Sequence, residues 1–297
     1  MSFAINLLMA LLVAPLMAGV VRKFVRGLVH SRQGPPLAQP FHDLTKLLSK
    51  EDLRTSISFL MNYAPTIVLA AMLAAALLTP MGLPAPINAH GDLVLFVYML
   101  ALAAIATIMI SVSAVGPYSM ANSAAEIIGH FTVEPVMVIC LLAAALKAAS
   151  PTMWDLATWN ADNAGSLSMV VAAIALFLAL IAQVGKLPFD APEADTDIMD
   201  GPIAALSGPR LAQFQLASLM KQIIYASILA AVFIPWGLGY IFPLNVLVHI
   251  LKVCVLVVLM GLVDVVNPRL RSEQVMWFFV FVIVLALAAL GLAIAGL

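Results

Sequence analysis

Eight long apolar runs follow one another along the chain and are separated by shorter polar segments. They cover residues 3–21, 61–79, 93–114, 131–149, 167–186, 213–235, 243–266 and 274–296. A helix needs about 20 predominantly apolar residues to cross a bilayer. Because the runs are continuous and do not alternate apolar with polar positions, they are typical of membrane helices and not of barrel strands. The pattern predicts an all-α, polytopic integral membrane protein with eight transmembrane helices.

Composition excludes several other classes of protein. Of the 297 residues, 64% are hydrophobic and 10% are charged, whereas a soluble domain has roughly 25% charged residues. The formal net charge of −1 does not favour a nucleic-acid-binding protein, which relies on excess positive charge. No motif repeats at a period of about 20–50 residues, and no inverted halves are visible. Residues 1–297 are therefore expected to form a single membrane domain.

The basic residues are distributed unevenly between the connecting segments. Eleven of the 14 lysines and arginines lie in the segments 22–58, 186–212 and 265–273, whereas the segments 80–92 and 236–242 and both termini have none. Basic residues gather on the cytoplasmic side of membrane proteins. We therefore expect the three basic segments in the cytoplasm and both termini outside.

The first of these segments, residues 22–58, has the features of a docking loop. After the helix-breaking Gly34-Pro35-Pro36, apolar residues recur at helical spacing, which predicts an amphipathic helix along the membrane interface. The apolar positions are Phe41, Leu44, Leu47 and Leu48. This helix either anchors the loop to lipid or forms a docking surface for a soluble partner. The candidate docking residues are Arg22, Lys23, Arg26, Arg32 and Lys46.

The segment 186–212 concentrates acidic residues. Five acids fall within eleven residues, and they are Asp190, Glu193, Asp195, Asp197 and Asp200. If Pro192 takes the first helical position, Glu193, Asp197 and Asp200 share one face and Asp195 lies opposite. A solvated face of this kind is only an acidic first turn. A face packed on the membrane domain has carboxyls whose pKa rises through burial and mutual repulsion, which suits a coupling element that also includes Lys186.

Ionisable residues also interrupt the apolar runs, where each costs about 2.5–3.5 kcal/mol at mid-bilayer. Glu126, His130 and Glu134 stand at i, i+4 and i+8, which places them in one stripe before Pro135. The stripe is interpreted as a proton relay or as glutamates hydrogen-bonded between helices. A metal site lacks further ligands at suitable spacing, so no metal is predicted.

Three further ionisable residues, Lys221, Lys252 and Asp264, lie in the later runs. Lys221 either takes part in a proton pathway or reaches toward the cytoplasmic face. Lys252 and Asp264 are separated by 12 positions, or about 18 Å along a helix, so each needs a partner on another element. Cys140 and Cys254 have no CxxC or Cys/His spacing, and neither a disulfide nor an iron–sulfur cluster is predicted.

Several of these segments resemble a known family. Ser31-Arg32-Gln33-Gly34-Pro35 and Asp43-Leu44-Thr45-Lys46-Leu47-Leu48 resemble the first loop of the membrane subunit that anchors the hydrophilic arm of proton-pumping NADH dehydrogenase (complex I). Glu134-Pro135 and the segment 188–194 are similar to distinctive motifs of the same family. The segments 185–190, 200–202, 207–208 and 232–237 look like the formate hydrogenlyase subunit 4 branch, which belongs to the group 4 [NiFe] hydrogenases.

The chain departs from the pattern of that branch at several positions, among them Leu206 in place of a tyrosine. Gln33 stands where the branch has a second arginine, and Ala205 replaces an acid near the end of the acidic segment. Gln33 falls in the candidate docking loop and Ala205 in the candidate coupling segment. The reduced acids of the coupling segment point to an altered efficiency or route of proton entry, or to a branch with a different electron donor.

The resemblance implies a function that the residues alone do not specify. The chain would be catalytically silent by itself and would have no cofactor of its own. It would hold a hydrogenase small subunit, a ferredoxin-like subunit with [4Fe-4S] clusters and a large subunit with a [NiFe] centre on a bacterial or archaeal cytoplasmic membrane, beside antiporter-like membrane subunits. It would couple hydrogen evolution to H⁺ or Na⁺ movement. The alternatives are a quinone-chamber subunit of an NADH dehydrogenase-like complex and a stand-alone ion transporter.

The acidic segment generates a prediction about individual carboxylates. We expect Glu193→Gln and Asp197→Asn to impair turnover or coupling strongly, because each removes a member of a cluster that titrates as a unit. Asp195→Asn should have the smallest effect, because this residue points away from the shared face. Hydrogen evolution and membrane potential in the assembled complex measure both effects. Near-normal behaviour of all three variants would reduce the cluster to a solvated helix start.

Overall fold

A computed structural model describes most of the chain as helices. It describes residues 2–25, 27, 34–53, 59–87, 92–114, 117–163, 165–189, 206–268 and 270–296, without the side chains of residues 60, 117–122, 125, 126 and 272. The helices are α1 (Ser2–Leu8), η1 (Met9–Val13), α2 (Ala14–Val20), η2 (Val21–Val25), α4 (Gln39–Leu48), α5 (Phe59–Leu78), α6 (Leu93–Ser113), α7 (Pro117–Ala148), α8 (Met153–Asp162), α9 (Leu167–Gln183), α11 (Gly208–Ile228), η3 (Leu229–Phe233), α12 (Leu244–Val266) and α13 (Ser272–Ile294).

Seven of the described helices are long and apolar enough to span a membrane. They are Ser2–Val25, Met61–Leu78, Leu93–Ser113, Ile127–Ala148, Gly208–Phe233, Leu244–Val266 and Glu273–Ile294. The eighth predicted span corresponds to α9, a shorter apolar helix of 17 residues. The predicted all-helical, polytopic membrane architecture is confirmed.

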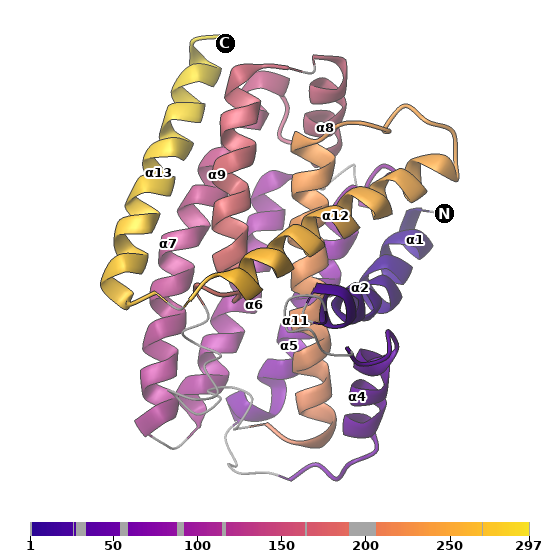
Figure 1. The fold of residues 1–297 in the computed structure, drawn as a ribbon, viewed down its shortest axis with the longest axis vertical. Coiled ribbons are helices and arrows are strands. Elements are labelled where there is room, and N and C mark those ends of the chain that lie inside the picture. Colours follow the sequence, from indigo (N-terminus) through magenta and orange to yellow (C-terminus); the bar gives the residue numbers. More distant parts are fainter. Residues whose placement is uncertain are drawn as a thin grey trace.

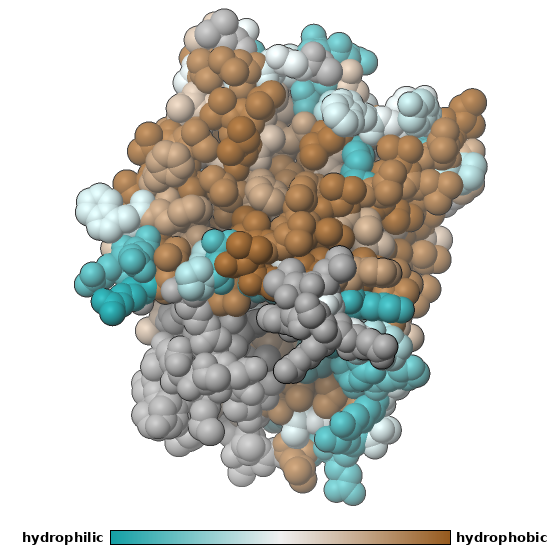
Figure 2. All heavy atoms as spheres, viewed as in Figure 1, coloured by the Kyte–Doolittle hydropathy of each residue, from teal (hydrophilic) through white to brown (hydrophobic). Residues whose placement is uncertain are grey.

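The spans pack into one bundle, in which α11 contacts α2, α4, α5 and α12. Helices α7, α9 and α13 stand side by side, and α12 runs obliquely across the bundle (Figure 1). Helices α5 and α6 pack on each other, and α5 also contacts α11. The span formed by α11 and η3 is the most buried of the seven, which explains why it can carry polar residues that lipid would not tolerate. Broad hydrophobic surface covers the middle of the visible face, and hydrophilic residues gather near α4 and the first turn of α13 (Figure 2).

The structure differs from the sequence-based helix boundaries in two places. Helix α7 is 32 residues long and begins well before the apolar run, so that Glu126 and His130 are already helical. Helix α8 was not predicted, because it is short and only weakly apolar. It begins where the Thr152 hydroxyl accepts a hydrogen bond from the Asp155 backbone N–H, as N-caps do. The hydroxyls of Thr152 and Ser150 also lower the pKa of the Asp155 carboxyl through hydrogen bonds.

Two π-helical segments precede prolines. Segment η1 ends just before Pro15 and η3 ends just before Pro235. A proline ring has no N–H to donate, and it crowds the preceding turn. A wider π turn is one way to accommodate this interruption inside a helix. Hydropathy alone does not reveal such a change of helical pitch.

Glycines allow the segment before α4 to lie against the first span. A Cβ atom at Gly19 of α2 would overlap the carbonyl oxygen of Leu37, and one at Gly34 would lie 2.6 Å from the Lys23 carbonyl oxygen. The backbone of residues 34–38 therefore approaches α2 and η2 more closely than any other residue type allows. This contact, together with packing of α4 on α11, holds the amphipathic helix beside the bundle.

The Gly19 contact predicts opposite effects of one substitution at two helical glycines. Gly19→Ala should destabilise the chain in spite of the higher helix propensity of alanine, because the added methyl group overlaps the Leu37 carbonyl. Gly129→Ala in α7 should be neutral or stabilising by up to about 1 kcal/mol, because no described atom lies within 4 Å of the place that its methyl group would take. Thermal unfolding of the purified chain in detergent compares the two. Equal effects would contradict the close approach.

Candidate functional site

Five polar side chains from three helices meet inside the bundle, and we call them the central polar cluster. His130 and Glu134 come from α7, Gln183 from the last residue of α9, and Lys221 and Tyr225 from α11. Each of the α7 and α11 pairs is spaced four residues apart, so both members of a pair lie on one helix face. Gln183 and Tyr225 are buried, and the other three side chains are partly buried.

Gln183 connects the two helical pairs. Its Nε2 donates a hydrogen bond of 2.9 Å to the Tyr225 hydroxyl and lies 3.3 Å from Nδ1 of His130. The Lys221 ammonium is close enough to act electrostatically on both His130 and Glu134, and Glu134 acts in turn on Tyr225. The cluster therefore contains an acid, a base, an imidazole and a phenol in mutual electrostatic contact.

Glu134 has an unsatisfied atom at the centre of this cluster. One carboxyl oxygen, Oε1, is buried and has no hydrogen-bond partner among the described residues. A buried polar atom without a partner costs about 1–3 kcal/mol, and more when it is charged. Protonation of the carboxyl or a bound water would change the free-energy cost of this unpaired oxygen. Intramembrane acids of this kind are typical of ion pathways.

Lys252 of α12 binds the end of η3. Its ammonium donates to the carbonyl oxygens of Ala230, at 2.9 Å, and Ile234, at 2.7 Å. In a π-helix the Ala230 carbonyl would accept from residue 235, but Pro235 has no N–H. Asn160 of α8 donates in the same way to the Val232 carbonyl, at 2.8 Å. These two side chains replace the backbone donors that the end of the helix lacks.

Asp264 holds the beginning of the acidic segment. Its Oδ1 accepts a hydrogen bond of 3.1 Å from the Leu187 backbone N–H, and the Leu270 N–H donates to the Pro188 carbonyl at 3.1 Å. The ring of Phe189 packs against those of Phe278 and Phe279, with centroid distances of 4.9 and 5.4 Å. Lys186 is half-buried in the same turn. The described part of the segment is thus attached to the junction of α12 and α13.

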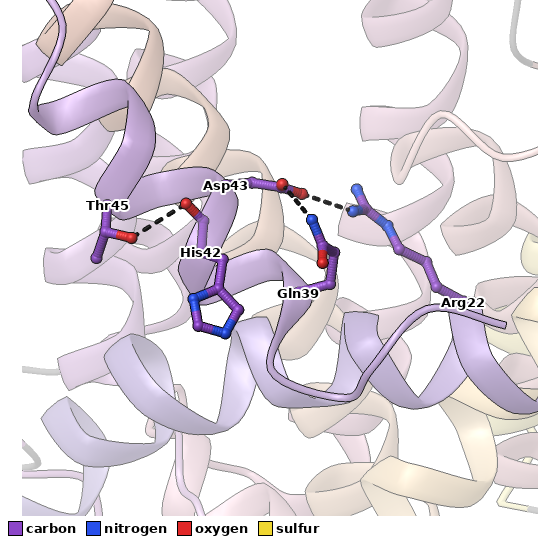
Figure 3. A network of polar contacts seen from close by, with 5 residues as sticks. All are labelled: Arg22, Gln39, His42, Asp43 and Thr45. Atoms are coloured by element: carbon purple, nitrogen blue, oxygen red, sulfur yellow. Dashed lines mark hydrogen bonds and ion pairs between the residues drawn. The ribbon is translucent and has the colours of Figure 1, made fainter.

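The predicted docking loop is fastened to the bundle by polar contacts. Arg22 pairs with Asp43 of α4 at 3.1 Å, and the other Asp43 oxygen accepts from Gln39 at 2.8 Å (Figure 3). Lys23 and Lys46 are exposed. The charge of Arg22 is therefore compensated within the chain, whereas the charged side chains of the two lysines are exposed at the surface.

A second set of contacts joins the segment after α4 to the start of α11. Arg210 forms a 3.0 Å ion pair with Asp52 and donates to Asn62 at 2.6 Å. The Ser207 hydroxyl donates to the Leu53 carbonyl at 2.6 Å. Gly208 has a positive φ of 53°, and its Cβ position would lie 2.5 Å from the Glu51 carbonyl oxygen. The docking loop and the most buried span are thus one connected unit.

Several predicted site residues lie outside the described part of the chain. They are Arg26, Arg32, Asp190, Glu193, Asp195, Asp197 and Asp200, together with the side chain of Glu126. Among the described residues, no three His, Cys, Asp or Glu side chains come together in a way that could hold a metal ion. Of the predicted pathway residues that are described, His130, Glu134 and Lys221 meet in the central polar cluster. Asp264 and Lys186 lie together at the beginning of the acidic segment, and Lys252 lies at the end of η3.

The chain matches one known family over almost its full length. Residues 1–295 match the family described as NADH dehydrogenase. The chain belongs to the NADH dehydrogenase subunit 1 family. The resemblance that the loop motifs and Glu134-Pro135 suggested is thereby confirmed, and the protein is a membrane subunit of the kind found in complex-I-like assemblies.

Relatives within this family come from different complexes. Hydrogenase-4 component C of Escherichia coli (strain K12) is 28% identical over 293 residues, which cover 95% of this chain and 91% of the relative. Formate hydrogenlyase subunit 4 of the same organism is 27% identical, with 91% and 90% covered. NADH-ubiquinone oxidoreductase chain 1 of Paracentrotus lividus is 26% identical, with 92% and 87% covered.

The fold also has a counterpart among solved structures. A chain of the membrane-bound sulfane sulfur reductase, an archaeal respiratory membrane complex, superposes with a TM-score of 0.88 and covers 98% of this chain and 99% of its own length. The sequences are 22% identical, so the likeness concerns the fold.

Three polar residues of these sites did not emerge from the sequence. Gln183, Tyr225 and Asn160 carry no charge at neutral pH, so they do not stand out in an apolar run as ionisable residues do. One signal was present in the sequence: Tyr225 follows Lys221 by one helical turn, just as Glu134 follows His130. The contact of Gln183 with both pairs depends on how α7, α9 and α11 pack, which sequence spacing does not specify.

The electrostatic contact between Glu134 and Lys221 predicts non-additive effects on stability. Lys221→Met should destabilise the chain, because it leaves the Glu134 carboxylate without a compensating charge, and adding Glu134→Gln should recover part of the loss. A double-mutant cycle of thermal unfolding should give a coupling of about 0.5–3 kcal/mol. Lys147→Met, near the far end of α7, is the control and should be additive with Glu134→Gln. Additivity of both pairs would mean that Glu134 and Lys221 do not interact.

Proposed function

We propose that this protein is the membrane anchor and ion-coupling subunit of a complex-I-like, membrane-bound [NiFe] hydrogenase, such as a formate hydrogenlyase. The observation that carries the proposal is Glu134, whose buried Oε1 has no hydrogen-bond partner among the described residues and whose carboxyl is acted on electrostatically by Lys221. Similarity to hydrogenase-4 component C and to formate hydrogenlyase subunit 4 over more than 90% of the chain supports the hydrogenase branch.

The docking role is assigned to α4 and the residues around it. Lys23 and Lys46 are exposed and can meet acidic groups of a soluble partner, and Arg22 stabilises α4 through Asp43. Arg26 and Arg32 extend the same basic segment in the sequence. Since Gly19 and Gly34 hold this loop closely to the first span, a partner that binds it is fixed relative to the bundle. The partners are a [NiFe] large subunit, a small subunit and a ferredoxin-like subunit, which carry the metal clusters.

The coupling role joins the acidic segment to the central polar cluster. Electron transfer to the partner's centre changes the charge near the acidic segment, and the carboxyls there respond by taking up or releasing protons. The route then continues to the buried groups and to antiporter-like membrane subunits. The pathway residues are Glu126, His130, Glu134, Lys186, Asp190, Glu193, Asp195, Asp197, Asp200, Lys221, Lys252 and Asp264.

The proposed orientation follows from the distribution of charge. The basic docking loop and the acidic segment face the cytoplasm of a bacterial or archaeal cell, and both termini lie on the outer side of its cytoplasmic membrane. In this orientation the end of the bundle that carries α4 and the first residues of α5 and α11 receives the soluble partners.

A quinone-reducing complex is the second candidate. The similarity to NADH-ubiquinone oxidoreductase chain 1 over 92% of this chain favours it. In that case the subunit would line a quinone chamber, and the electron acceptor would be a quinone in place of protons. Sensitivity of turnover to a quinone-site inhibitor separates the two candidates, because hydrogen evolution needs no quinone.

The proposal is tested on the complex purified gently through a tag on this chain. A [NiFe] large subunit should co-purify, and the complex with Glu134→Gln should evolve hydrogen at a reduced rate while the linked ion gradient is lost. Glutamine keeps the shape and most hydrogen bonds of glutamate but cannot titrate. Glu273→Gln, an exposed acid in the first turn of α13, is the matched control and should leave both activities unchanged. Absence of a hydrogenase subunit, or normal pumping by Glu134→Gln, would overturn the proposal.

A further inference from the structure

The side-chain amide of Gln183 is the one group that touches both polar pairs of the central cluster, among the described residues. Its Nε2 has two hydrogens, and the structure directs this nitrogen at two acceptors, the Tyr225 oxygen at 2.9 Å and His130 Nδ1 at 3.3 Å. An amide cannot pass a proton from one neighbour to the next, because it does not titrate. Gln183 can therefore link the two pairs through the orientation of its amide, but not by passing a proton.

The contact with His130 holds in only one protonation state of the imidazole. Nδ1 accepts a hydrogen bond from Gln183 only when it has no hydrogen of its own, so that the ring proton of neutral His130 sits on Nε2. When His130 takes up a proton, Nδ1–H faces the amide N–H, and the two donors repel each other. Rotation of the Gln183 amide by 180° exchanges Nε2 with Oε1 and relieves this conflict, because Oε1 can accept from Nδ1–H.

The same rotation reverses the hydrogen bond to Tyr225. While Nε2 donates to the Tyr225 oxygen, the hydroxyl hydrogen points away from Gln183 and is available to another acceptor. After rotation, Oε1 needs that hydrogen, and the hydroxyl turns toward Gln183. Tyr225 lies within electrostatic reach of Glu134, whose buried Oε1 has no hydrogen-bond partner among the described residues. The direction of the Tyr225 hydroxyl therefore changes the surroundings of that carboxyl.

We propose that Gln183 is a two-position switch that makes the electrostatic surroundings of Glu134 depend on the protonation of His130, through the direction of the Tyr225 hydroxyl. No covalent bond changes at Gln183, and the proton that His130 gains or loses does not pass through it. Gln183 and Tyr225 are positioning residues in this scheme. The use of the switch in ion coupling rests on the proposed function, whereas the switch itself is a property of this chain.

Apart from Lys221, the titratable side chains named here on the surrounding helices are exposed, bound by other groups or buried elsewhere. Lys221 lies beside Glu134 and His130 and acts on both. On the helices packed against α7, α9 and α11, Tyr63 of α5, Tyr98 of α6 and Glu273 of α13 are exposed. Asp155 of α8 is bound by Ser150 and Thr152, and Asp162 lies at the exposed end of that helix. On α12, Lys252 and Asp264 have the contacts described above, and His249 is buried one turn from Lys252.

Spectroscopy on the full chain in lipid nanodiscs tests the switch without any partner subunit. Selective ¹⁵N-histidine labelling reports the His130 ring, whose signal is assigned by its loss in His130→Gln. Infrared difference spectra report the Glu134 carboxyl, assigned in the same way with Glu134→Gln. In the wild-type chain, the Glu134 band should change over the same pH interval in which His130 titrates.

Two variants break the link at different points, and a third serves as a control. In Gln183→Leu and in Tyr225→Phe, the Glu134 change should separate from the His130 titration by at least about one pH unit, or tenfold in proton activity. Gln222→Leu removes a buried glutamine from the neighbouring helix α11 and should keep the two changes together.

The outcomes separate the switch from a direct charge effect and from the proposed function. Direct electrostatic interaction between His130 and Glu134 would survive in both Gln183→Leu and Tyr225→Phe, and persistence of the link in these variants overturns the switch. Independent titration of His130 and Glu134 in the wild-type chain overturns it as well. Because the measurement needs no hydrogenase, it succeeds or fails independently of whether hydrogenase subunits co-purify with the chain.

Discussion

The lack of water in the hydrocarbon core constrains every polar atom of this protein. A polar group in that region must find its partner within the chain or bear the full cost of dehydration. The side-chain nitrogen of Asn6 meets the constraint by donating to the carbonyls of Ala76 and Thr79 at the end of α5. Asn245 does the same for Gly82, at 2.8 Å. These buried amides join spans that apolar packing alone would leave free to slide.

Breaks in the regular helix follow the same rule. Prolines remove backbone donors at η1 and η3, and the groups left over at η3 are taken by Lys252 and Asn160. A lysine in a span is costly when it lacks partners, but here its charge stabilises carbonyl oxygens at the negative end of a helix. Buried atoms of Asn6, Ser166, Ser227 and His249 also lack a hydrogen-bond partner among the described residues, but Glu134 is the one carboxyl in this set. For this reason the proposed coupling function is assigned to Glu134.

Polar contacts between distant segments fasten the connections to the spans. At the end near α4, the loops are fastened to the spans by Asp43, Arg210 and Asp264, each through contacts between segments far apart in the sequence. A binding event on α4 is thereby connected to α11, and an event in the acidic segment is connected to the end of α12 and the start of α13. The central polar cluster lies on α7, α9 and α11, so that both connections reach helices that carry it or pack on it.

Much of this architecture is determined by the sequence alone. Continuous apolar runs of about 20 residues have one stable form in lipid, so the helices, their approximate bounds and the amphipathic α4 could be predicted. The stripe of His130 and Glu134 was also visible, since helical spacing places residues on a face without any knowledge of neighbours.

Only the tertiary structure decided what those faces meet. Gln183, Tyr225 and Lys221 reach the stripe because of how three helices pack, and Lys252 and Asp264 find their partners on elements that spacing along one helix cannot identify. The physical reason is that the periodicity of the sequence determines the direction in which a side chain points from its own helix. Packing between helices determines which partner that side chain meets.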